Sequence, residues 1–190
     1  MRDARLNLIG EGANDVLRCF IAAVGIRHVG KSLQEVQSAP WTAYKLFKTS
    51  AKLPVKHEHT RYFANSIGKQ IGRFAWATEM ALIKHREGIL DQQFAQARLG
   101  DIATELFMSS CVYSRLSALL VNGTIPEPKK KIEIDTAMLY MKMARIRNER
   151  RFEDLKTNFD ADLVGVADQW LEHDYSRNWV VTPDEKDIPQ

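Results

Sequence analysis

Apolar positions recur at the helical period along most of this chain. In residues 14–29 they fall three to four residues apart and form one apolar face, made by Val16, Leu17, Phe20, Ile21 and Val24. The same period marks four further segments, residues 58–86, 90–121, 132–155 and 159–171. No convincing alternating run of β-branched residues suggests a strand. The pattern therefore predicts an all-α protein, an antiparallel helical bundle with short loops.

Several residues predict where these helices begin and end. Asn14 or Asp15 can cap the first helix by accepting hydrogen bonds from free backbone N–H groups. Gly88 follows a run of cations and is a suitable stop for the second helix, because glycine tolerates a left-handed backbone. Asn122-Gly123, followed by two prolines, ends the third helix.

Composition narrows the class of protein. The chain has 190 residues, of which 45% are apolar and 27% charged, values typical of a globular protein and unlike a disordered or collagen-like chain. No apolar run approaches the ~18 residues of a membrane span, and no secretory signal is expected. The two cysteines, Cys19 and Cys111, provide neither a disulfide framework nor a zinc ligand set, so no metal site is expected.

Charge is distributed unevenly. Residues 41–73 carry seven cations against one acid, whereas residues 153–190 carry ten acids against three cations. Aromatic residues interleave with the lysines of 41–73, as in a basic helix that lies on an anionic membrane surface. The alternative is a solvated helix whose aromatic residues join the core. No nucleic-acid motif accompanies the charge, so nucleic acid is not an expected partner.

Glu11 is the main candidate for chemistry. It lies between Gly10 and Gly12, after an apolar stretch and before a helix start. A carboxylate in an apolar slot has a raised pKa, which suits a general base, and the N-terminus of a helix suits phosphate. The spacing alone leaves the alternative of a solvated turn with an exposed acid.

Two motifs resemble those of the acyl-CoA dehydrogenases. Residues 2–18 read R-D-A-R-L-N-L-I-G-E-G-A-N-D-V-L-R, similar to the family form R-D-x-R-x-x-x-I-x-E-G-T-N-(D/E)-I-L-R. Residues 82–94 read L-I-K-H-R-E-G-I-L-D-Q-Q-F, similar to K-L-I-K-H-K-x-G-I-x-x-(E/Q)-Q-F of the very-long-chain branch. Two departures are Gly10, where the family has an aromatic residue, and Ala13, where it has threonine.

The resemblance implies a reaction and a set of site residues. These enzymes introduce an α,β double bond into acyl-CoA, and Glu11 occupies the position of the glutamate that takes the α-proton. The β-hydrogen leaves as hydride to FAD. Gly12 matches a substrate-contacting position. The positions that match FAD contacts are Ala13, Asn14, Asp15 and Gln93.

The resemblance also implies a domain organisation. Residues 1–37 correspond to the end of the C-terminal helical domain of the dehydrogenase, and 61–175 to a helical C-terminal extension. Between them lies a basic amphipathic linker, 38–60, and an acidic tail follows at 176–190. Because the family's other domains carry most FAD and CoA contacts, we expect a C-terminal fragment that is inactive alone.

Partners and location follow from the same resemblance. Long-chain acyl-CoA, an electron-transfer flavoprotein or similar acceptor, and a second copy in a homodimer are the expected partners. The expected location is the mitochondrial inner membrane or matrix for a eukaryotic protein and the cytoplasm, with peripheral membrane contact through 41–73, for a bacterial one. The alternative is a non-catalytic helical module for assembly or membrane docking, which Gly10 and Ala13 favour.

Overall fold

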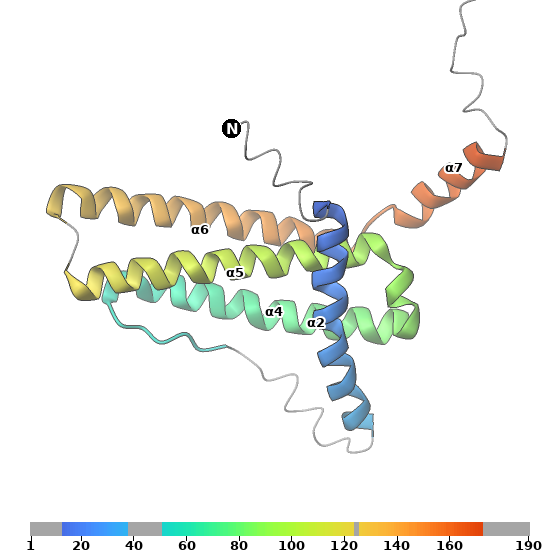
Figure 1. The fold of residues 1–190 in the computed structure, drawn as a ribbon, viewed down its shortest axis with the longest axis horizontal. Coiled ribbons are helices and arrows are strands. Elements are labelled where there is room, and N and C mark those ends of the chain that lie inside the picture. The colour runs from blue at the N-terminus through green and yellow to red at the C-terminus, as the bar shows by residue number, and fades with distance from the viewer. Residues whose placement is uncertain (1–12, 38–50, 124–125, 173–190) are drawn as a thin grey trace, which may run out of the picture. The chain divides into compact units, whose positions relative to one another are not determined.

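The computed structural model describes residues 13–37, 51–123 and 126–172, and within these ranges all the regular elements are helices (Figure 1). The chain divides after Lys156 into two compact units, which are described separately. The first unit holds α2 (Asn14–Gln37), η2 (Glu58–Thr60), α4 (Arg61–His85), η3 (Arg86–Asp91), α5 (Gln93–Asn122) and α6 (Glu127–Lys156). The second holds α7 (Asp160–Glu172). The predicted all-α class is confirmed.

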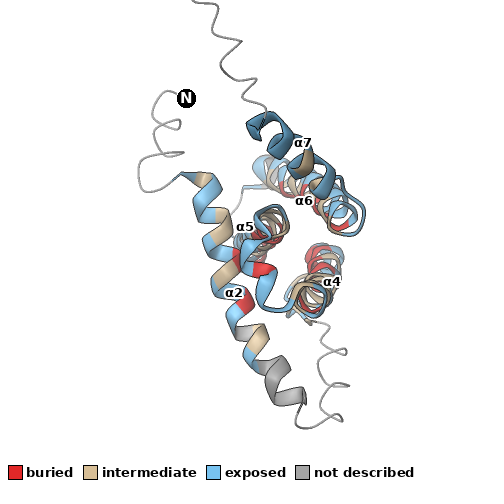
Figure 2. Ribbon diagram, turned by 90° about the vertical axis from the view of Figure 1, so that its right-hand side faces the viewer, coloured by how far each residue is buried: buried red, intermediate tan, exposed pale blue. Residues whose placement is uncertain are grey.

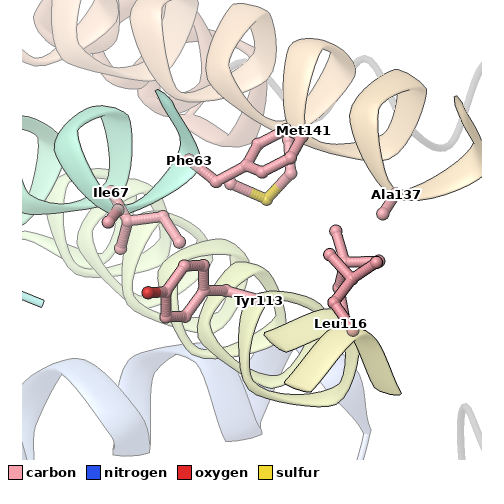
Figure 3. Packing of buried hydrophobic residues seen from close by; sticks show 8 residues of the cluster. Phe63, Ile67, Tyr113, Leu116, Ala137 and Met141 are labelled. Carbon is pink, nitrogen blue, oxygen red and sulfur yellow. The ribbon is translucent and has the colours of Figure 1, made fainter. Parts of the chain in front are cut away.

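The first unit is built on three antiparallel helices. α4, α5 and α6 lie side by side with reversed direction from one to the next (Figure 1). Their buried residues face one another, while exposed residues line the outer sides (Figure 2). One core cluster joins Phe63 and Ile67 of α4 with Tyr113 and Leu116 of α5 and Met141 of α6 (Figure 3). Burying such side chains stabilises the bundle by about 1.5–3 kcal/mol each.

α2 crosses α5 at a glycine. A Cβ atom added to Gly100 would lie 2.4 Å from the carbonyl oxygen of Arg18, so the absence of a side chain permits this close approach. Ala22 and Ile26 pack beside the crossing with Leu99 of α5 and Ile89 of η3. The apolar contacts of α2 with the bundle therefore come from a narrow strip of small and apolar residues.

The apolar face expected for the first helix is on the outside. Val16, Phe20 and Val24 are 66%, 63% and 48% exposed, and Leu17 and Ile21 are also exposed. The helical period is confirmed, but the residues that pack on α5 lie beside this face. Sequence periodicity identifies an apolar face without identifying its partner, and no described residue covers this one.

The predicted helix ends agree with the structure only in part. α2 already includes Asn14 and Asp15, which were expected as its cap, and it continues to Gln37 and not to residue 29. Gly123 has φ 62° and ends α5 as expected. α4 ends at His85, and the positive φ of 50° lies at Arg86, not at Gly88, which belongs to η3. The turn is fixed by Gln96, whose side chain donates to the carbonyls of Ile89 and Leu90 at 2.8 and 2.7 Å.

α6 begins at Glu127, five residues before the expected Ile132. The carbonyl of Pro126 accepts hydrogen bonds from the N–H groups of Lys129 and Lys130. Pro128 stands in the first turn of the helix, where a missing N–H removes no intrahelical bond. The two prolines therefore mark a helix start, and the lysines that follow belong to the helix.

In the second unit, α7 has no buried residue. The side chain of Asn158 accepts a hydrogen bond from the N–H of Asp160 at 3.3 Å, as expected at a helix start.

Candidate functional site

The predicted site residues fall in three places. Glu11 and Gly12 lie outside the described residues. Ala13, Asn14 and Asp15 form the start of α2, where the carbonyl of Ala13 accepts the N–H of Leu17 at 3.0 Å. Ala13 and Asp15 are exposed and Asn14 is half-buried. The first N–H groups of α2 have no acceptor within the helix, as at every helix N-terminus.

Gln93, the first residue of α5, is the remaining predicted site residue. It is exposed, and its carbonyl lies 4.0 Å from the Cys19 thiol of α2, as a weak hydrogen bond. Cys19 is about one helical turn beyond Asp15. The structure therefore brings the start of α5 close to the first turns of α2, although the two motifs are far apart in sequence.

A chain of ion pairs fixes the first turns of α2. Arg18 pairs with Asp15 at 3.0 Å and with Asp101 of α5 at 2.8 Å. Asp101 in turn pairs with Arg151 of α6 at 3.5 Å. The Asp15 contact is exposed and contributes little, whereas Asp101 is mostly shielded, so the Arg18–Asp101 pair is the stronger anchor.

Glu105 of α5 is the carboxylate whose environment is most unusual, and sequence analysis missed it. It accepts hydrogen bonds from Arg147 at 2.8 and 2.7 Å, from the Tyr140 hydroxyl at 2.9 Å and from Arg151 at 3.4 Å. These bonds, above all those from Arg147, lower the pKa of Glu105 to about 2 although burial opposes the shift. Burial, followed by the bond to Glu105, raises the pKa of Tyr140 to about 12.

This ion cluster joins helices and does not resemble a catalytic centre. Glu105 is permanently ionised at neutral pH and its acceptors are occupied, so it is a poor base. The sequence does carry a signal for it. Asp101 and Glu105 are four residues apart on α5, and Arg147 and Arg151 are four apart on α6, so each pair shares a helix face.

The basic segment 41–73 is only partly described, because residues 41–50 lie outside the described ranges. In the rest, Tyr62 is exposed but Phe63 belongs to the core. Arg73 is paired with Glu149 and Glu153 of α6 and lies over the Phe152 ring at 4.4 Å. Phe63 and Arg73 are therefore used within the bundle, whereas Lys52, Lys56, Arg61 and Lys69 are exposed. Among the described helices, none has the length and apolar character needed to cross a bilayer.

A hollow of about 250 Å³ lies between α4 and α6, walled by Trp76, Met80 and Phe152 with Lys84 at its rim. None of the predicted site residues lines it. Ala95, in the first turn of α5, also lines it, so the hollow reaches the start of that helix without including Gln93.

Comparison with known proteins gives consistent matches. A family model described as ACAD9/ACADV, C-terminal domain, matches residues 59–175. The very long-chain specific acyl-CoA dehydrogenase, mitochondrial, of Macaca fascicularis is 31% identical over 183 residues, which cover 84% of this chain and 28% of that protein. The enzymes of the same name from Homo sapiens and Mus musculus are 30% and 27% identical with the same coverage. The chain thus spans 28% of the length of these relatives.

Proposed function

This chain belongs to the ACAD9/ACADV C-terminal domain family, and from that premise we propose that it is the C-terminal part of an FAD-dependent acyl-CoA dehydrogenase. Its substrate would be a long-chain acyl-CoA of fatty acid β-oxidation. The observation that carries the proposal is the 27–31% identity to very long-chain specific acyl-CoA dehydrogenases over 84% of the chain. The glutamate motif at residues 2–18 agrees with it.

In this proposal Glu11 takes the proton from the α-carbon of the thioester while the β-hydrogen leaves as hydride, so that a carbon–carbon double bond forms. FAD, when bound, supplies the hydride acceptor. The N–H of Glu11 donates to the thioester carbonyl and makes the α-proton more acidic. Gly12, which has no side chain, leaves room for the substrate next to the base.

The start of α2 has free backbone N–H groups that favour an anionic cofactor and a carboxylate, Asp15, that disfavours one. Ala13 and Asn14 stand at a helix N-terminus whose free N–H groups suit a pyrophosphate. The Asp15 carboxylate would repel the same group, but Arg18 pairs with it at 3.0 Å and offsets its charge. Gln93 is exposed near these turns and is free to contact a flavin edge. These residues would hold the cofactor only together with other parts of an enzyme.

The test of the catalytic role joins this chain to the flavin-binding and substrate-binding domains of a related very long-chain enzyme. Dehydrogenation of palmitoyl-CoA is followed with an artificial electron acceptor. Glu11→Gln should reduce turnover by a factor on the order of 10²–10⁴, the usual contribution of a general base, and should leave the bound flavin in place. Glu58→Gln, which changes an exposed acid of η2, is the matched control and should be fully active. Retained turnover in Glu11→Gln would contradict the assignment of the base.

The partners and location belong to the same proposal. An electron-transfer flavoprotein or similar acceptor would reoxidise the flavin, and the enzyme would act as a homodimer. The relatives carry the word mitochondrial in their names, so a mitochondrial location would apply to a eukaryotic source. Peripheral membrane contact through 41–73 would show as vesicle binding at low salt that high salt abolishes.

One observation favours the second candidate, a non-catalytic helical module for assembly. The apolar face of α2 is exposed although it lies next to the glutamate motif, as expected of a surface that docks on another protein. The loss of the threonine hydroxyl at Ala13 points the same way. Flavin content of the assembled protein separates the two, since a non-catalytic assembly would form without FAD.

A further inference from the structure

The hollow between α4 and α6 is a concave apolar site that the proposed dehydrogenation does not use. Its volume is about 250 Å³, just below the ~300–1,000 Å³ of small-molecule pockets. Trp76 and Met80 of α4 and Phe152 and Leu155 of α6 supply its large apolar walls. All of these residues belong to the first unit.

Small side chains leave this space open. Ala77 and Ala81 of α4 and Ala95 of α5 line the hollow, and each of them is half-buried. Phe152, which is 2% exposed, forms the inner side, whereas Trp76, which is 46% exposed, stands at the outer edge. The hollow therefore has a defined depth, and a larger residue at an alanine position would fill it.

Two of the basic residues in the lining are already neutralised by acids of α6. Glu153 accepts hydrogen bonds from Arg73 at 3.1 Å and from Lys156 at 3.2 Å, and Glu149 also pairs with Arg73. The two acids do not line the hollow. Because these four charges cancel, neither Arg73 nor Lys156 selects a ligand by net charge.

Lys84 and His85 stand at the other end of the α4 wall. Lys84 is eleven residues beyond Arg73, about 16 Å along the helix. It is exposed and forms no ion pair with another described residue, including the exposed Glu87 nearby. Burial, followed by the charge of Lys84, lowers the pKa of His85, so this imidazole is neutral at pH 7. Lys84 is therefore the lining cation that remains available to an anionic ligand.

From this hollow and the cation at its end we propose that the chain binds an unbranched aliphatic carboxylate between α4 and α6. The carboxylate would pair with Lys84, and the hydrocarbon chain would lie over Ala81 and Ala77 toward Phe152. Burial of the chain against apolar walls drives binding, and the ion pair fixes the direction of the ligand. This inference does not rest on the proposed role of Glu11.

Larger occupants fit the hollow less well. A helix with its side chains is about 10–12 Å in diameter, so even two of its turns exceed a volume of 250 Å³. A phosphate headgroup carries more charge than Lys84 alone can balance. A single alkyl chain that ends in one carboxylate matches both the volume and the charge.

The first test measures binding to the full chain by isothermal titration calorimetry, with each ligand below its micellar concentration. The ligands are unbranched carboxylates from butanoate to tetradecanoate, with dodecyltrimethylammonium as the cationic counterpart of dodecanoate. We expect affinity to rise by up to about fourfold for each added methylene until the hollow is filled, and then to level off. Dodecyltrimethylammonium should bind at least about tenfold more weakly than dodecanoate, because Lys84 would repel it.

Substitutions then locate the site. Ala77→Leu should weaken dodecanoate by about tenfold or more, because it displaces at least two methylenes. Ala118→Leu, which changes an exposed alanine of α5 outside the hollow, is its control. Lys84→Gln should weaken dodecanoate by about two- to fivefold, as expected of a partly exposed ion pair. Lys69→Gln, which changes an exposed lysine of α4 outside the hollow, should have no effect.

Trp76 provides a signal from the hollow itself. Dodecanoate should change the tryptophan fluorescence of the chain, and Trp76→Phe should reduce that change while calorimetry still records binding. Thermal unfolding verifies that each variant is folded, and Ala81→Leu is a second variant that fills the hollow. The proposal is wrong if dodecanoate does not bind, if both dodecyl ligands bind equally, or if Ala77→Leu and Ala81→Leu both leave the affinity unchanged.

Two further results would assign the hollow to another occupant and so overturn the proposal. One is a dimer in sedimentation velocity that Ala77→Leu dissociates. The other is binding to phosphatidylcholine vesicles that Ala77→Leu abolishes while free dodecanoate does not bind.

Discussion

Gly100→Ala tests how α2 is held on the bundle. The added Cβ would lie 2.4 Å from the carbonyl oxygen of Arg18, 3.0 Å from its carbonyl carbon and 3.2 Å from its Cα. All three atoms are backbone, so no side chain can turn aside. α2 would have to withdraw by about 1 Å to restore ordinary contact.

Two opposing contributions determine how much Gly100→Ala changes the free energy of unfolding. Overpacking at a well-packed position costs about 1–3 kcal/mol, while alanine in place of glycine within a helix gains up to about 1 kcal/mol. Because the new Cβ would meet backbone atoms, which cannot turn aside, the overpacking cost should lie in the upper part of that ~1–3 kcal/mol range. The net loss is therefore about 1–2 kcal/mol, which lowers Tm by roughly 2–8 °C in a chain of this size.

Gly25→Ala is the matched control. Gly25 lies within α2, and an added Cβ there meets nothing within 4 Å. The same substitution should therefore raise Tm by roughly 2–4 °C through helix propensity alone. Thermal unfolding followed by circular dichroism measures both variants, and hydrogen exchange shows whether α2 alone loses protection in Gly100→Ala. If Gly100→Ala raised Tm as Gly25→Ala does, α2 would not cross α5 at Gly100.

Three other predictions concern titrating groups. Glu105→Gln should lower the free energy of unfolding by about 3 kcal/mol at pH 7. Because the pKa of Glu105 is lowered to about 2, the stability difference between this variant and the unchanged chain should vanish as the pH falls from 4.5 to 2, as measured by urea titrations. Because the pKa of Tyr140 is raised to about 12, the chain should lose stability as the pH rises from 10 to 12, and Tyr140→Phe should remove that loss in alkaline unfolding curves. Burial raises the pKa of Glu79 above 4.5, and no hydrogen bond or ion pair joins it to another described residue, so the ionised form is disfavoured in the fold. Glu79→Gln should therefore raise the urea midpoint at pH 7, and a lowered midpoint would contradict this reasoning.

The sequence predicts most of the described helices within a few residues, because the apolar period is strong. It does not predict which glycine matters. Gly88 follows cations and looks like a stop, whereas Gly100 lies in the middle of a helix and gives no local signal. The importance of Gly100 arises from the path of α2, which is distant in sequence.

The sequence likewise predicts only part of the candidate site, because the rest depends on how elements distant in sequence pack together. The residue types at 2–18 and 82–94 are sufficient to recognise a resemblance to a family. That resemblance in turn indicates a candidate base. The ion cluster around Glu105 depends on the register between α5 and α6, which periodicity does not fix. Likewise, the outward direction of Phe20 and its neighbours follows from the absence of a covering described element and not from their spacing.

The way α2 is attached has a consequence for folding order. α4, α5 and α6 pair with their neighbours in sequence, so their contacts form rapidly. α2 reaches α5 across a wide sequence separation, as in the contact between Cys19 and Gln93, and holds it over a narrow strip. It should therefore join last and detach first. A motif carried on such an element can adjust its position against an incoming domain while the three-helix scaffold stays intact.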